Sequence, residues 1–414
     1  MSLRQSWERR VPNEISSIVI ENLADNFPAL RNTALACRDF AALAQPHIFR
    51  EIDLEENYCH QVLFRSYPRV HRLASLLQNS EINRYVQRLH LSSSGIPSDV
   101  VAHILRHLTA LTSLSIHDPE CRLFQEIETS SVRGTLKQLH LYSPFPCRWD
   151  FVSFKRMLLS LSDLEVLAVC GSRRFSEPGA FLLPSSLRMA SFTKINADLL
   201  RAIGAGLQIS PLPFLHTLIL DPFAAIPRGH VDWNGLASDT QIIYKVHTDY
   251  FTDPFRQARS FTFATRGIAA TKLMFICLQS PWIAQPFACI ISHLPGTVRE
   301  LCINITAEAQ DAHCYDRSLP RSPSREWTEF DSALVKRHEQ GLLHRVCFRC
   351  TKCEGTGSPK HYIFSYSSLH NPTNEKIVLE NRTILDEVED NLPRSKGRGF
   401  LEVDRDTVFF EPTM

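Results

Sequence analysis

The sequence predicts an α/β fold in which a small helical unit at the N-terminus precedes a long solenoid of strand–helix repeats. Two observations support this. Apolar residues recur at helical spacing between residues 11 and 54, and a short apolar pattern recurs at a nearly constant interval within residues 86–305. Because such repeats stack on one another, we expect parallel strands on a concave face and helices on a convex face. The 414 residues then form an N-terminal helical unit, which we call the hook, and an array of strand–helix repeats.

Composition and charge narrow the class of protein. Lys and Arg number 45 against 44 Asp and Glu, which disfavours general binding to nucleic acid or to an anionic membrane. No apolar run approaches the ~18 residues of a membrane span, and the polar tail of residues 1–10 has no export signal. We therefore expect a soluble protein of the cytoplasm and/or nucleus, with its 12 cysteines as reduced thiols.

The sequence contains no motif for catalysis or cofactor binding. It has neither of the glycine-rich patterns that hold phosphates, GxGxxG and GxxxxGK followed by Ser or Thr, and it has no GxSxG. His338 and His344 are six positions apart, which is wrong for two zinc ligands on one helix face. We expect a protein that is not an enzyme and needs no cofactor.

Residues 11–54 have the periodicity of a helical unit. Pro12 suits the first turn of a helix, and Glu14 suits the positive end of its dipole. Apolar residues then follow at helical spacing from Ile15 to Leu23, and the stretch from Leu30 to Leu43 predicts a second helix. A unit of about 40 residues has too little core to stand alone, so it needs a partner surface.

Two stretches of this unit resemble the F-box family. Val11-Pro-Asn-Glu-Ile15 is similar to the LP-x-E start of an F-box, and Leu35-Ala-Cys-Arg-Asp-Phe40 is similar to its V-C-[RK]-x-[WF] signature. The resemblance implies a three-helix F-box that binds a Skp-type adaptor and, through it, a cullin. It implies adaptor contacts at Pro12, Ile15, Ile18, Leu23, Leu35, Cys37, Arg38 and Phe40. The alternative is an ordinary helical hairpin whose apolar residues face its own domain.

The repeating pattern is apolar-x-x-apolar-x-apolar. Six regular copies begin at residues 86, 111, 136, 164, 187 and 215, at intervals of 23 to 28 residues, and two less regular copies begin at 258 and 298. The last two apolar positions alternate as on one buried face of a strand. Helical patterns lie between copies, at Ser98 to Leu108, Phe151 to Leu161 and Ile195 to Ile203.

These units resemble leucine-rich repeats, with one departure. The asparagine that such repeats carry three residues after the strand is absent from all six regular copies. The loops must therefore satisfy their backbone groups in another way.

Polar residues at outward strand positions are predicted to line the concave sheet and bind a protein target. The candidate contacts are Arg88, His90, His117, Gln138, His140, Tyr142, Thr217, Asp221 and Glu300. The alternative is that most of these side chains are merely solvated. The three histidines recur at nearly the same register, and we expect a solvated row there in preference to a metal site, because no carboxylate or thiol recurs with them.

Periodicity and composition divide the rest of the chain. We assign connecting and capping helices to 55–85 (with a helix at Val70 to Leu77), a polar loop to 306–329, a C-terminal cap to 330–350 (a helix ended by Gly341, then a strand from Leu342 to Phe348), and an unassigned, partly flexible tail to 351–414.

Three cysteines lie close together near the end of the predicted cap. Cys347, Cys350 and Cys353 form a CxxCxxC run. Structural zinc sites usually pair one CxxC with a second pair from elsewhere, so we interpret the run as thiols at the end of a strand, with zinc as the alternative.

The hook and the array together predict a substrate-recognition adaptor subunit of an SCF-type (Skp–cullin–F-box) ubiquitin ligase, which holds an unknown protein target while other subunits supply the chemistry. One alternative is an F-box and leucine-rich-repeat scaffold without ubiquitin transfer. The other is a zinc-binding protein or metal-dependent enzyme.

Overall fold

The computed structural model describes residues 13–54, 66–79, 81–92, 96–143, 150–171, 179–222, 231, 233–247, 261–262, 264–265, 268–278, 284–306, 324–351, 385–386 and 388–409. Within these ranges the chain is an α/β protein, and twelve strands form one parallel sheet whose strand order, β1 to β12, follows chain order. The predicted α/β class with parallel strands is confirmed. The chain divides into two compact units, Met1–Leu139 and His140–Met414, so that β4 (Gln138–Tyr142) spans the boundary.

The first unit begins with three helices, α1 (Asn13–Asn22), α2 (Phe27–Ala36) and α3 (Arg38–Ile48). They pack around a buried centre of Ile20, Leu30 and Ala44. The single helix predicted from Leu30 to Leu43 is wrong, because Cys37 is extended (φ −159°) and separates α2 from α3. The Cys37 Sγ atom accepts a hydrogen bond from the Phe40 backbone N–H at 3.4 Å and so caps α3.

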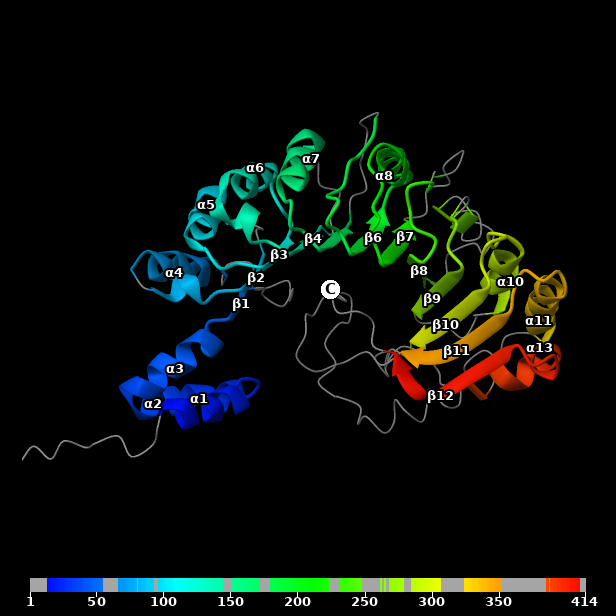
Figure 1. Ribbon diagram of the computed structural model, residues 1–414, viewed down its shortest axis with the longest axis horizontal. Helices are drawn as coiled ribbons and strands as arrows, with labels where there is room; N and C mark the ends of the chain where they lie inside the picture. The colour runs from blue at the N-terminus through cyan, green and yellow to red at the C-terminus, as the bar shows by residue number, and fades with distance from the viewer. Residues whose placement is uncertain are drawn as a thin grey trace, which may run out of the picture. The chain divides into compact units, whose positions relative to one another are not determined.

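The sheet of the first unit starts directly after these helices. β1 (Glu51–Leu54) pairs with β2 (Arg88–Ser92), which pairs with β3 (Ser113–His117). Figure 1 shows α4 (Ser66–Asn79), α5 (Ser98–His107) and α6 (Cys121–Thr129) along one side of these strands. Two short 3-10 helices, η1 (Glu81–Arg84) and η2 (Ser131–Gly134), precede β2 and β4.

Two helix predictions in this unit are confirmed and one strand was missed. α4 covers the helix predicted at Val70 to Leu77, and α5 covers the one predicted from Ser98. The sequence pattern assigns Ile52 and Leu54 to the N-terminal hook, whereas they lie in β1 and pair with Leu89 and Leu91.

The second unit continues the same alternation of strands and helices. Figure 1 shows α8, α10 and α11 along one side of its strands. Its elements are α7 (Phe151–Ser160), β5 (Val166–Cys170), β6 (Met189–Ile195), α8 (Ala197–Ile209), β7 (Thr217–Pro222), β8 (Gln241–His247), β9 (Lys272–Leu278), α10 (Ala284–Ser292), β10 (Glu300–Thr306), α11 (Ser324–Glu339), β11 (Arg345–Thr351), α13 (Pro393–Gly397) and β12 (Leu401–Phe409).

A recurring backbone contact sets the strand register. At the start of a strand, two successive N–H groups donate to one carbonyl of the preceding strand region, as Arg188 and Met189 do to the Glu165 oxygen at 2.8 and 3.0 Å. Arg299 and Glu300 do the same to the Thr271 oxygen at 2.8 and 3.0 Å. The apolar positions of the repeat therefore stack in rows across the sheet.

The rows form the core of the second unit, on the helix side of the sheet. One row consists of Leu167, Ala190, Leu218, Ile242, Leu273, Leu301 and Val346, each paired with the next and all buried. An aromatic series lies beside them, in which Phe275 meets Phe287 at a ring-centroid distance of 5.1 Å and Phe330 meets Phe348 at 6.3 Å. Residues that alternate with these rows lie on the opposite side of the sheet, which we call the second face.

Serine and threonine hydroxyls replace the missing asparagines. A hydroxyl one to three residues before a strand donates to a carbonyl 22 to 29 residues earlier. The donors are Thr135 to Leu111 O (2.7 Å), Ser186 to Leu164 O (2.8 Å), Thr240 to Leu215 O (2.8 Å) and Thr297 to Ile268 O (2.9 Å). These side chains connect successive repeats and satisfy carbonyls that the strands leave unpaired.

The C-terminal region extends beyond the predicted cap. Helix α11 ends as predicted, because Gly341 adopts φ 68° and its N–H donates to the His338 carbonyl at 2.9 Å. The predicted strand is confirmed as β11, but it is followed by β12, which pairs with it. Buried Asp331 in α11 holds this last segment, since its carboxylate accepts from the backbone N–H groups of Arg394 (3.0 Å) and Ser395 (2.9 Å).

The sequence predicts a strand at residues 258–263, and this prediction is wrong at the two positions that the structure describes, 261 and 262. Phe261 and Thr262 are helical, between β8 and β9. Phe261 fits the apolar pattern because it is a core residue, with its ring 5.0 Å from Tyr244 and 5.5 Å from Phe275.

We predict that Thr240→Val lowers the free energy of unfolding by about 1–3 kcal/mol, because the buried hydroxyl can no longer donate to the Leu215 carbonyl. Thr129→Val is the matched control, since the exposed Thr129 hydroxyl bonds only within its own helix. Urea unfolding followed by circular dichroism measures both. Equal destabilisation by the two variants would show that the inter-repeat hydroxyl contributes nothing particular.

Candidate functional site

Helix α1 carries apolar side chains on two faces. Ile20 is 1% exposed in the centre of the three-helix unit, whereas Ile15, Ile18 and Val19 are 51%, 56% and 47% exposed. A helix that is apolar on both faces is typical of one with neighbours on both sides. The outer face of α1 therefore has the character of a contact surface.

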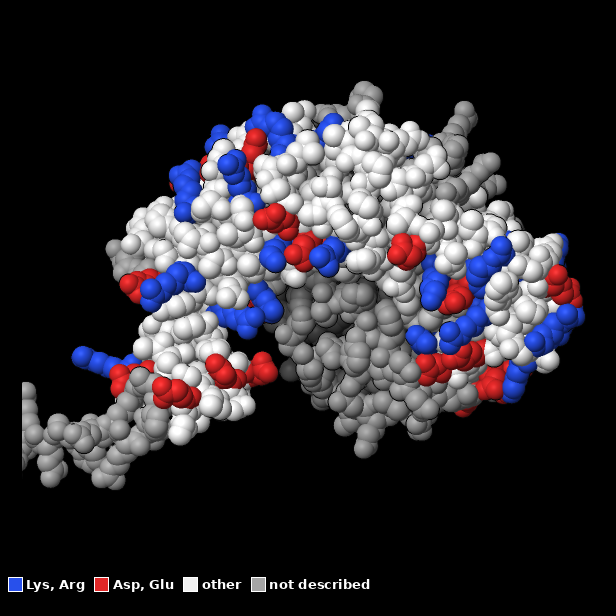
Figure 2. Space-filling model, in the orientation of Figure 1, with Lys and Arg blue, Asp and Glu red and all other residues white. Residues whose placement is uncertain are grey.

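Helix α2 adds two exposed apolar residues, one at each end. Phe27 is 54% exposed and Leu35 is 78% exposed. We call Ile15, Ile18, Val19, Phe27 and Leu35 together the apolar surface of α1 and α2. Figure 2 shows acidic side chains scattered over these helices, with uncharged surface between them. Exposed apolar groups of this kind mark interaction sites in many proteins.

The residues implied by the F-box resemblance fall into three groups. Ile15, Ile18 and Leu35 belong to the apolar surface, and Cys37 and Arg38 are exposed at the junction of α2 and α3. Leu23 and Phe40 instead pack against the buried centre of the unit.

Pro12 lies outside the described residues. Sequence reasoning missed Val19 and Phe27. Helical spacing could have identified Val19, because it lies one turn after Ile15. Phe27 could have been identified as an apolar residue beside the proline that starts α2.

The second face of the first unit has a small charged cluster. The Arg88 Nη1 atom lies 3.2 Å from Glu51 Oε2, and the His90 Nε2 atom lies 3.7 Å from Glu51 Oε1. Arg88 is exposed and His90 is half-buried. These side chains can meet a partner, as the sequence predicts for them.

The histidines are not gathered into a metal site. His90 pairs with Ser115, and His117 pairs with Ser92, so the two histidines lie two register positions apart. His140 is half-buried on β4 between exposed Gln138 and half-buried Tyr142. Among the described residues no three His, Cys, Asp or Glu side chains are close enough to share a metal ion.

Two of the predicted target contacts, His117 and Asp221, have buried side chains that are closed to solvent. His117 and Asp221 are each the last second-face residue of their strand, where the chain leaves the sheet, and both have interactions within the protein. Asp118, directly after His117, has a left-handed backbone (φ 52°), which marks the tight turn at this point. Thr217 and Glu300 are half-buried and remain open to a partner.

Ion pairs cover the second face of the last strands. Lys272 Nζ lies 3.3 Å from Glu300 Oε2, Arg345 Nε lies 2.7 Å from Glu402 Oε2, and Arg349 Nε lies 3.2 Å from Asp404 Oδ2. Figure 2 shows basic and acidic side chains alternating over these strands. Because each of these three cations has a carboxylate partner, the described part of this surface offers no continuous basic stripe for a polyanion.

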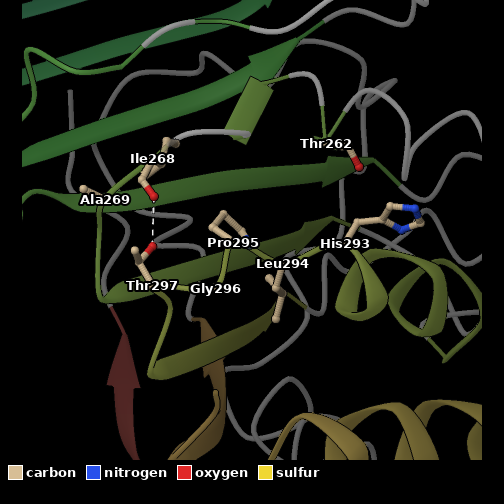
Figure 3. A pocket seen from close by; sticks show the side chains of 8 residues that line it. All are labelled: Thr262, Ile268, Ala269, His293, Leu294, Pro295, Gly296 and Thr297. Carbon is tan, nitrogen blue, oxygen red and sulfur yellow. Dashed lines mark hydrogen bonds between the residues drawn. The ribbon is translucent and has the colours of Figure 1, made fainter. Parts of the chain in front are cut away.

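A cavity of about 530 Å³ lies between the segment before β9 and the segment before β10. Figure 3 shows the His293 ring pointing away from Pro295 and Thr297. The Thr297 hydroxyl is occupied by its bond to the Ile268 carbonyl at 2.9 Å, and the other lining residues are mainly apolar. The eight lining residues include no paired nucleophile and base, so the cavity has no evident chemistry.

Two positions of the CxxCxxC run, 347 and 350, belong to one strand, β11. Cys347 pairs with Cys302, and position 350 pairs with Ile305. Cys353 lies outside the described residues.

The chain matches no model of a known protein family, and no curated protein resembles it in sequence at a significant level. No helix in the described ranges combines the length and the apolar character needed to cross a bilayer.

We predict opposite outcomes for two isoleucines of α1. Ile20→Ala should lower the free energy of unfolding by about 2–5 kcal/mol, because it leaves a cavity in the centre of the three-helix unit. Ile18→Ala should change it by less than about 0.5 kcal/mol, because Ile18 is 56% exposed. Thermal unfolding of both variants provides the measurement, and a large cost at Ile18 would show that its face is already covered.

Proposed function

We propose that the chain is a non-catalytic substrate-recognition subunit of an SCF-type ubiquitin ligase. In this proposal residues 11–54 bind a Skp-type adaptor, and through it a cullin, while the strand–helix region binds a protein target. The observation that carries the proposal is the apolar surface of α1 and α2, which has five exposed large apolar side chains in a unit with a very small core of its own. The proposed compartment is the cytoplasm and/or the nucleus.

The composition of α1 favours a partner over simple exposure to water. Leaving an Ile or Val side chain uncovered forgoes about 1.5–3 kcal/mol that burial would contribute. Three such side chains on one helix face, together with Phe27 and Leu35, could supply the apolar anchor residues of an interface. The F-box resemblance independently places adaptor contacts at Ile15, Ile18 and Leu35.

The junction of α2 and α3 supplies the second part of the proposed contact. Cys37 holds the junction in an extended conformation, and the exposed Arg38 directly follows it. An arginine beside apolar anchors is a common interface feature, because its guanidinium can donate several hydrogen bonds at the rim.

The second face of each unit is proposed to contribute target contacts. In the first unit it presents Arg88, His90 and Gln138, and in the second unit it presents His140, Tyr142, Thr217 and Glu300, all in exposed or half-buried positions. Extended surfaces of repeat proteins commonly bind other proteins, with a few aromatic and arginine residues dominating the affinity. Arg88 and Tyr142 are the strongest candidates by residue type.

We predict that Ile18→Asp and Leu35→Asp each weaken binding to a purified Skp-type adaptor by at least about tenfold, because each places a charge in an apolar contact. Isothermal titration calorimetry with the full chain measures the affinity. Ile209→Asp is the matched control, since Ile209 is 68% exposed on α8 and lies outside the proposed contact. If the wild-type chain does not bind the adaptor, or if all three variants bind equally, the proposal fails.

We further predict that the double variant Ile18→Asp, Leu35→Asp lengthens the cellular half-life of proteins that bind the second face, because they are no longer brought to the ligase. Cycloheximide chase of co-purified partners is the measurement. Unchanged half-lives, with adaptor binding lost, would instead support a scaffold that binds the adaptor without ubiquitin transfer.

A further inference from the structure

Two cysteine thiols meet on the second face of the second unit. Cys302 in β10 and Cys347 in β11 are register partners in adjacent parallel strands, and both are free cysteines. Their neighbours Leu301, Ile303, Val346 and Phe348 are buried on the helix side, so both thiols lie on the second face. Cys302 is half-buried and Cys347 is buried.

The backbone geometry suits a covalent bond between these residues. Adjacent strands lie about 4.8 Å apart, which falls within the ~4.4–6.8 Å that a disulfide spans between Cα atoms. Side chains of register partners leave the sheet in the same direction, so the thiols of Cys302 and Cys347 lie side by side on the second face. A disulfide therefore needs no change of register.

The surroundings favour the thiolate of Cys347 over that of Cys302. The neighbouring Cys302 thiol lowers the pKa of the Cys347 thiol; burial opposes this effect, and the nearby Arg349 guanidinium lowers the pKa further. The Cys347 thiol, together with burial, raises the pKa of Cys302. Arg349 is held near Cys347 by its ion pair with Asp404 at 3.2 Å.

We propose that Cys302 and Cys347 are a reversible oxidation site at which a hydroperoxide converts the two thiols to a disulfide. The Cys347 thiolate attacks one oxygen of hydrogen peroxide; an S–O bond forms, the O–O bond breaks, and the released hydroxide takes up a proton to become water. The Cys302 sulfur then attacks the sulfenic acid sulfur; the S–S bond forms, the S–O bond breaks, and the hydroxyl group leaves with the Cys302 proton as water. Two thiols and one peroxide give one disulfide and two waters.

The strand geometry also accounts for reversibility. The ~4.8 Å strand spacing is near the lower limit for a disulfide, and disulfides away from the preferred geometry are reduced more easily. The modified residues lie two residues from Glu300 and Arg345 on the same strands, within the second face. The inference does not depend on adaptor binding, so it can hold or fail independently of the proposed function.

The test is oxidation of the full-length wild-type chain with hydrogen peroxide, alkylation of the remaining thiols, and peptide mass spectrometry without reduction. We expect one cross-linked peptide pair that contains Cys302 and Cys347 and that disappears after treatment with dithiothreitol. In Cys302→Ser, dimedone should instead trap a sulfenic acid at Cys347. Arg349→Gln should slow the oxidation, because removing this positive charge lowers the thiolate population of Cys347.

Cys170→Ser is the matched control and should leave the cross-link unchanged, because half-buried Cys170 pairs with Thr193 and has no register partner with a thiol in β6. The cross-link is sought in the wild-type chain, so the result does not depend on whether a serine variant folds. Recovery of Cys302 and Cys347 as separate alkylated or over-oxidised peptides, with no cross-link at any peroxide concentration, would overturn it.

Discussion

The described part of the chain depends on one constraint, the in-register pairing of parallel strands from successive repeats. The strands have four to nine residues, and such a strand is not stable alone. Stability comes from stacking, in which two successive N–H groups bond one carbonyl of the preceding strand region and a hydroxyl connects several of the repeats. Every apolar row of the core follows from that register.

The same register also determines the chemistry of the second face. When Leu301 and Val346 align in the core, Cys302 must align with Cys347, and Glu300 must lie beside Lys272 and Arg345. Ion pairs and thiol contacts on this face are thus consequences of the core alignment. A shift by one residue would separate all of them and would expose the apolar rows.

The three N-terminal helices are different, because their contacts are incomplete. Their centre is small, and α1 presents as much apolar character outward as inward. In a solenoid each repeat covers its neighbour, but the outer face of α1 has no such cover among the described residues. This asymmetry is the physical basis of the adaptor-binding proposal.

The sequence pattern found strands whether or not their second face is polar. β2 and β4 alternate buried and exposed residues, and β7 was also found although Ile219 is buried on its second face. β8 escapes the pattern because Asp239 stands at the first apolar position of the unit, and β9 was missed although Ala270, Leu273 and Phe275 fit it. β12 alternates, but it follows β11 after a gap far longer than the repeat interval.

The candidate sites could be predicted only in part, because local spacing does not report contacts between distant parts of the chain. The exposed positions of α1 follow from local spacing and from the F-box resemblance, whereas spacing missed the junction at Cys37. The burial of His117 and Asp221 depends on long-range packing that no local pattern reports. Cys302 and Cys347 each lie between two apolar core residues, and only the register of β10 and β11 shows that they meet.

Hydrogen–deuterium exchange of the full chain, with and without a saturating Skp-type adaptor, tests the central claim most directly, because it locates the contact without altering a residue. The account predicts slower exchange in α1 and at the junction of α2 and α3, with the strands from β2 to β12 unchanged. Unchanged exchange in those helices, or protection confined to the strands, would contradict it.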